Sequence, residues 1–212
     1  MKIDDDGRIR SKCLSDQEIP VGSGGALALL DCELVNCTVT VDDLHIPLFR
    51  CKLVDCTLVL KRALKNTRAF NCRYERCTFK GLCTGVDFGR DPHIDPISKT
   101  YDTLGEFIDC DFTHAKLDLC RFFSVDIHRQ AFAPWPQFVV PHARELAASN
   151  LERQWPGEFK NYLDLAKDEN PKLSATTGTV DYFCHNKKKN RGFALTEAEL
   201  RQALLDVGGV VM

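Results

Sequence analysis

Pairs of cysteines five residues apart recur through the first half of this chain, and this spacing constrains the fold more than any other feature. The pairs are Cys32/Cys37, Cys51/Cys56 and Cys72/Cys77, and the same step continues at Cys110, Ala115, Cys120 and Val125. Ten pentads aligned on this step have cysteine first in eight cases, a polar or charged residue second and an apolar residue third. A period of five fits neither a helix nor a plain strand.

A longer period groups the pentads into coils. Cys32 and Cys51 are 19 residues apart and Cys51 and Cys72 are 21 apart, so about four pentads complete one turn of a four-sided coil. Successive coils then stack at the strand spacing of about 4.8 Å. The first and third residues of each pentad point inward, where thiols and larger apolar side chains fill a narrow interior, because a free cysteine packs as a small hydrophobe.

The step from Cys72 to Cys110 is 38 residues, about two coils. We therefore predict a further coil between residues 78 and 109 whose signal is weak, with Val86-Asp87-Phe88 as its remnant. The predicted structural core consists of the inward cysteines and apolar residues of the clean pentads: Cys32, Cys37, Cys51, Cys56, Cys72, Cys77, Cys110, Cys120, Leu34, Leu53, Tyr74, Phe79, Phe112, Leu117 and Phe122.

These pentads, which include CELVN-CTVTV, CKLVD-CTLVL and CRYER-CTFKG, resemble the pentapeptide-repeat family over residues 27–130. The resemblance implies a β fold, a right-handed four-sided parallel β-helix. Two features differ from the family: its small inward residue is usually Ala and here is Cys, and its second residue is commonly Asp or Asn and here is mixed. Some members bind type II topoisomerases by imitating DNA, and others serve in toxin, immunity or effector systems.

Three regions follow from the repeat and its limits. We expect residues 1–26 to form an N-terminal cap or a flexible segment, since they are polar and glycine-rich. Residues 27–132 form the predicted β-helix, with a proline-containing loop inserted at residues 89–106. Residues 133–212 form a helical C-terminal region that covers the exposed end of the last coil.

Helical spacing supports that assignment of the C-terminal region. Apolar residues recur at this spacing from Ala143 to Trp155, and a second short face runs from Phe159 to Ala166. Thr196 and Glu199 form a capping box at the start of the last helix, and Gly208-Gly209 ends it.

The eleven cysteines are read as reduced thiols of a cytoplasmic protein, because their number is odd and the N-terminus carries no secretory signal. Structural zinc favours a two-residue spacing between cysteines and four converging ligands, whereas a ladder spreads thiols along an axis. Cys184 next to His185 is no indication of a catalytic thiol. We predict no metal, no catalytic residues and no cofactor; Gly22-Ser23-Gly24-Gly25 lacks the features of a phosphate loop.

Charge gives two candidate interaction regions. Seven basic residues between positions 61 and 80 face Glu75 alone: Lys61, Arg62, Lys65, Arg68, Arg73, Arg76 and Lys80. Between positions 102 and 118 the charged residues are acidic except for Lys116: Asp102, Glu106, Asp109, Asp111 and Asp118. Asp91, His93 and Asp95 lie in the proline loop. The basic residues and the three loop residues are the predicted partner-binding set. The alternative for the charged bands, which we favour, is that they form an ordinary solvated wall of the rod. The alternative for the three loop residues is a charged turn.

The main functional hypothesis is a non-enzymatic protein–protein interaction module, an inhibitor, immunity or adaptor protein that binds an unidentified protein partner on its faces or end. Direct nucleic-acid binding through residues 61–80 and the Lys187–Arg191 run is one alternative. A topoisomerase-protecting DNA mimic is another, disfavoured by a net charge of −2. An enzyme site within residues 133–212 is a third.

Two further expectations concern assembly and membranes. A homodimer could form through a solenoid end or the terminal helix. The sequence contains no run of about 18 apolar residues, so we predict no membrane span.

Overall fold

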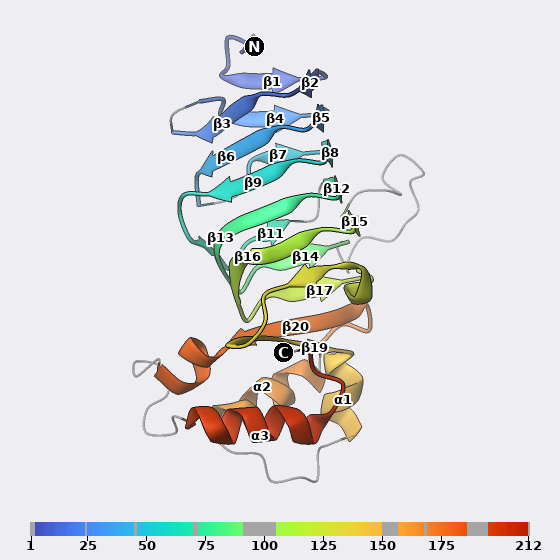
Figure 1. Cartoon of the computed structure of the whole chain (residues 1–212). Coiled ribbons are helices and arrows are strands. Elements are labelled where there is room, and N and C mark those ends of the chain that lie inside the picture. The colour runs from blue at the N-terminus through green and yellow to red at the C-terminus, as the bar shows by residue number, and fades with distance from the viewer. Residues whose placement is uncertain are drawn as a thin grey trace.

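The chain forms a four-sided parallel β-helix followed by a smaller unit of strands and helices (Figure 1). The computed structural model describes residues 3–23, 25–44, 46–69, 72–90, 105–149, 157–167, 169–185 and 195–211.

Strands of successive coils stack in parallel on each side of the rod. The first face consists of β1 (Arg8–Arg10), β4 (Ala28–Leu30) and β7 (Leu48–Phe49), and β11 (Arg68–Ala69), β14 (Asp87–Gly89) and β17 (Arg121–Phe123) take the same place in later coils. The second face consists of β2 (Cys13–Ser15), β5 (Glu33–Val35), β8 (Lys52–Val54), β12 (Arg73–Glu75) and β15 (Phe107–Ile108). Its five strands mark five coils, and β17 and β18 (Ala131–Phe132) on the neighbouring faces belong to a sixth, last coil.

The third face consists of β3 (Glu18–Gly22), β6 (Thr38–Asp42), β9 (Thr57–Leu60), β13 (Thr78–Thr84), β16 (Asp111–Asp118) and β18 (Ala131–Phe132). β13 and β16 continue past a register shift, and the short β10 (Leu64–Lys65) pairs with the end of β13. The fourth face consists of β10 and the ends of β13 and β16.

The register places the predicted core residues inside. Leu34 pairs with Leu53, Leu53 with Tyr74, and Tyr74 with Phe107. All fifteen predicted core residues are buried, at no more than 2% exposure. The predicted β-helix with thiols and apolar side chains in its interior is therefore confirmed.

The corners explain why cysteine suits the small inward position. In the described part of the chain, the residue before seven of the inward cysteines is left-handed, with φ from +50° to +55°, a conformation that Asp and Asn tolerate best among the residues other than glycine. After this turn, the Cys56 thiol donates to the carbonyls of Val54, at 3.3 Å, and Leu34, at 3.5 Å. The same two-carbonyl pattern recurs at Cys32, Cys37, Cys51, Cys77, Cys110 and Cys120. Alanine could not supply these hydrogen bonds.

The interior changes from aliphatic to aromatic along the rod. Ile9, Leu29 and Leu48 occupy the first face in the first three coils, whereas Phe88 and Phe122 occupy it later. On the third face, the rings of Phe79, Phe112 and Phe132 stack at centroid distances of 4.6 and 5.5 Å.

The predicted N-terminal cap is wrong, because residues 8–22 form the first coil. Ile9 pairs with Leu29, Leu14 with Leu34, and Ile19 with Val39. These residues fill the inward third position, but none has a cysteine two residues earlier, at the first position of its pentad. A repeat search based on cysteine therefore misses this coil.

The predicted extra coil between residues 78 and 109 is also wrong. Tyr74 pairs with Phe107 and Thr78 with Asp111, so Cys110 lies over Cys77, one coil away. Val86-Asp87-Phe88 belongs to this same coil, in and next to β14.

The excess length of this coil comes from the predicted loop insertion at residues 89–106. Most of the loop, residues 91–104, lies outside the described residues. A Cβ on Gly105 would approach the Gly89 carbonyl to 2.1 Å, so the two ends of the loop meet and positive-φ glycine is required there.

The C-terminal region contains strands as well as helices, contrary to the purely helical prediction. β19 (Gln137–Pro141) and β20 (Leu173–Thr179) are antiparallel, and β20 pairs with β17 of the last coil. Helices α1 (Ala143–Ser149), α2 (Gly157–Lys167) and α3 (Glu197–Val207) lie beyond them (Figure 1), and the short helical turn η3 (Asp181–His185) follows β20. Another short turn, η2 (Ile127–Arg129), belongs to the rod, between β17 and β18. The Thr196–Glu199 capping box and the Gly208 end of α3 are confirmed. Trp155 lies outside the described residues.

Side chains of this unit satisfy backbone groups that the last coil leaves without a strand partner. The Thr177 hydroxyl donates to the Leu117 carbonyl at 3.0 Å and accepts from the Cys120 N–H at 3.1 Å. The Gln137 side chain accepts from the Leu117 N–H at 2.8 Å. The unit therefore closes the end of the rod, as an exposed sheet edge requires.

Candidate interaction surface

The predicted basic residues encircle one coil instead of lining one face. Lys61 and Arg62 follow β9, Lys65 lies on β10, and Lys80 lies on β13. Arg68 lies on β11, Arg73 lies on β12 and Arg76 occupies the next corner. The predicted loop residues Asp91, His93 and Asp95 lie outside the described residues.

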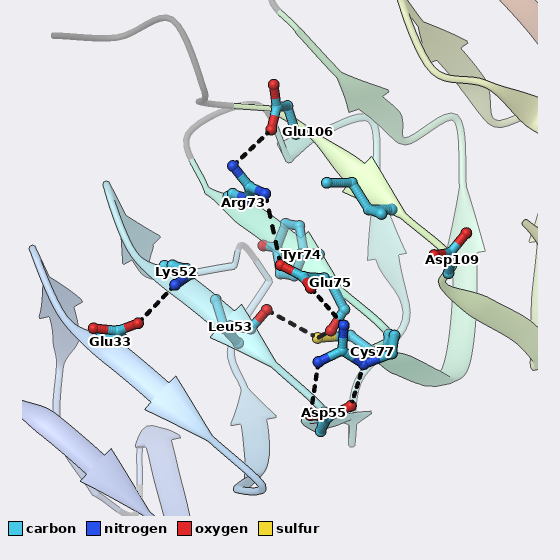
Figure 2. A network of polar contacts seen from close by, with 12 residues as sticks. Glu33, Lys52, Leu53, Asp55, Arg73, Tyr74, Glu75, Cys77, Glu106 and Asp109 are labelled. Atoms are coloured by element: carbon cyan, nitrogen blue, oxygen red, sulfur yellow. Dashed lines mark hydrogen bonds and ion pairs between the residues drawn. The ribbon is translucent and has the colours of Figure 1, made fainter. Parts of the chain in front are cut away.

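Three of the predicted arginines are engaged by carboxylates. Arg76 binds Asp55 through two hydrogen bonds of 2.7 and 2.9 Å and also contacts Glu75. Figure 2 labels both of these carboxylates, Asp55 and Glu75. Its guanidinium lowers the pKa of Asp55. Arg73 lies 3.2 Å from Glu106, and Arg62 lies 2.7 Å from Asp42.

These pairs belong to columns that run along the rod. Asn36 donates to Asp16 at 2.7 Å, and Arg129 binds Asp109 at 2.8 and 2.6 Å along the same corner as Arg76. Other columns hold Arg50–Asp31, at 2.6 and 2.7 Å, and Lys52–Glu33, at 2.8 Å. Arg73 and Glu106 join the predicted basic and acidic bands by an ion pair where two coils stack.

The lysines behave differently from these arginines. Lys61, Lys65 and Lys80 are exposed, and no hydrogen bond or ion pair engages them within the described part of the chain. Lys80 pairs in register with Val59 on one side and His114 on the other, and Lys65 pairs with Thr84. We call Lys61, Lys65, Lys80 and His114 the lysine patch. Sequence reasoning missed His114, which the register shift of β13 brings beside Lys80.

Among the described thiols, none combines a lowered pKa with exposure, as a reactive thiol does. Burial raises the pKa of Cys83 to about 12 and that of Cys110 to about 11. A hydrogen bond from Cys77 lowers the pKa of Cys56, but Cys56 is 1% exposed. Burial also raises the pKa of Cys184, opposite to the shift of a nucleophilic thiol. Among the described residues, no three His, Cys, Asp or Glu side chains converge as metal ligands would.

The fold is that of a β-solenoid, and comparison with known proteins adds no name to it. No family model, no curated protein and no solved structure matches the chain. Across the described residues, no helix has the length and hydrophobicity needed to cross a membrane.

Proposed function

We propose that this chain is a non-enzymatic protein-binding module, a divergent pentapeptide-repeat protein that acts in the cytoplasm. The observation that carries this proposal is the filled interior of the rod, from Ile9 in the first coil to Phe122 in the last, both at 0% exposure. Ligand sites are usually concave. Here the inner positions are occupied by the rod's own side chains, so a partner meets the outer faces.

The outer faces suit protein recognition because they are held in place. Strand ladders fix the backbone of each coil, and paired corner residues such as Arg76 and Asp55 fix side chains across coils. Docking on a preorganised surface loses little conformational entropy, which favours a specific complex.

The charge pattern favours an inhibitor, immunity or adaptor role over DNA mimicry. A DNA mimic needs a continuous negative surface, whereas this chain has a net charge of −2. Its corner carboxylates are also neutralised by arginines of adjacent coils, as at Asp31 and Asp109.

Face-resolved photo-crosslinking tests the proposal. A photoreactive amino acid replaces one outward residue per face in the full chain: Phe49 on the first, Val35 on the second, Thr40 on the third and Thr84 on the fourth. After irradiation in the native cytoplasm, we expect one and the same protein to be crosslinked from one face or two adjacent faces. Crosslinks that are absent from every face, or equally distributed over all four, would contradict a specific protein-binding role.

A further inference from the structure

We propose that the lysine patch is the docking site for a short acidic segment of the protein partner. This inference rests on the proposed function and names the surface and the partner's chemistry. The patch lies where the third and fourth faces meet, on or beside β9, β10, β13 and β16.

The lysines of the patch are available because no carboxylate in the described part of the chain forms an ion pair with them. Asp42 is close enough for the Lys61 charge to contribute to lowering its pKa, after the larger effects of Ser23 and Arg62. Its oxygens are already bound by Ser23, at 2.8 Å, and Arg62, at 2.7 Å. Engaging Lys61 therefore breaks no existing ion pair, whereas engaging Arg76 would displace Asp55.

Apolar side chains lie among the lysines, which favours a polypeptide as the occupant. Val59 is the register partner of Lys80, and Leu82 lies two residues further along β13. Both are half-buried and present apolar surface next to a cation. The described outward positions of β9, β10, β13 and β16 carry no Phe, Tyr or Trp on which a nucleobase could stack.

Carboxylates frame the patch and limit the length of an anionic partner. Asp42 lies beside Lys61, Asp111 pairs in register with Thr78, and Asp118 pairs with Thr84. A long phosphate backbone crossing this surface would meet these like charges. A short acidic segment of a folded protein would contact the lysines without reaching the carboxylates around the patch.

Binding of a fluorescent octaglutamate peptide to the full chain tests the site. The triple variant Lys61→Gln, Lys65→Gln, Lys80→Gln removes the cations without breaking an ion pair. The control Lys12→Gln, Lys160→Gln, Lys172→Gln removes the same charge elsewhere; it breaks the exposed Lys160–Asp164 pair, at 3.9 Å, a pair of a kind that contributes little to stability. By fluorescence anisotropy in low salt, we expect the patch variant to bind at least about tenfold more weakly and the control to stay within about twofold of wild type. Circular dichroism verifies that both variants fold.

Three outcomes would overturn the docking site: no binding of the peptide, equal loss in both variants, or tighter patch-dependent binding of a twenty-nucleotide DNA strand. Photo-crosslinking separates this failure from failure of the proposed function. Specific crosslinks from the first or second face alone would overturn the lysine patch and leave the binding module intact.

Discussion

The inward cysteine acts at the scale of a single residue in two ways. It fills the small inward position, and its thiol donates to two carbonyls near a left-handed corner, as Cys56 does to Val54 and Leu34. Serine would offer a stronger donor with more desolvation cost, and alanine offers none. The cysteine content of the sequence therefore follows from corner geometry.

Replacing one such thiol should measure its contribution. We expect Cys56→Ala to lower the free energy of unfolding by about 1–2 kcal/mol, because a small cavity and two weakly bonded carbonyls remain. Cys13→Ala, at an exposed position, should change it by less than about 0.5 kcal/mol. Urea unfolding followed by circular dichroism measures both, and equal effects of the two substitutions would contradict this role.

At the scale of the element, ion pairs join strands of neighbouring coils. The corner arginines lower the pKa of Asp31, Asp55 and Asp109. Another set of ion pairs joins the rod to the C-terminal unit. Arg121 of β17 binds Asp87 of β14 at 2.7 and 3.0 Å, and it binds Glu169, which follows α2, at 2.6 Å.

The corner pairs predict an acid-dependent loss of stability. The pKa of an Asp side chain in the unfolded chain is about 3.9. A carboxyl whose pKa is lower than this in the folded chain stabilises the fold at pH values above the unfolded pKa. The stabilisation is lost as the pH falls through the folded pKa. We therefore expect Arg76→Gln to lower the urea midpoint at pH 7, and the difference from wild type to shrink towards pH 2. A difference that is constant with pH would contradict the pairing.

Arg121→Ala should be more damaging than loss of an exposed arginine. It leaves Asp87, whose side chain is 9% exposed, without its partner. We expect a loss of about 2–3 kcal/mol, below the ~3–5 kcal/mol of a fully buried pair because the Arg121 side chain is 36% exposed. Arg50→Ala is the control for urea unfolding, and a loss as large there would contradict the special role of Arg121.

At the scale of the whole molecule, the repeat predicts the β-helix and its core but not where the rod begins and ends. Ile9, Leu14 and Ile19 have no cysteine two residues earlier, so the cysteine spacing does not reveal the first coil. β20 has a polar sequence, LSATTGT, because its threonines bond to the last coil, as Thr177 does. Its hydrophobic pattern therefore does not predict a strand.

The interaction surface was only partly predictable. The sequence of residues 61–80 identifies the basic side chains. Which of them remain available to a partner depends on ion pairs with carboxylates of the adjacent coil. Asp55 and Arg76 are 21 residues apart and hold the same position in their pentads. The coil period could therefore have predicted this ion pair. The position of His114 depends on a register shift that the sequence does not indicate.

Counting reactive thiols by mass spectrometry tests the β-helix most directly. All eleven cysteines are free; nine are buried, Cys13 is exposed and Cys184 is partly exposed. Brief alkylation of the native chain should label these two alone, and all eleven after denaturation in urea. Labelling of Cys56, whose pKa is lowered yet whose sulfur is covered, or of most other cysteines in the native chain would contradict a rod with its thiols inside.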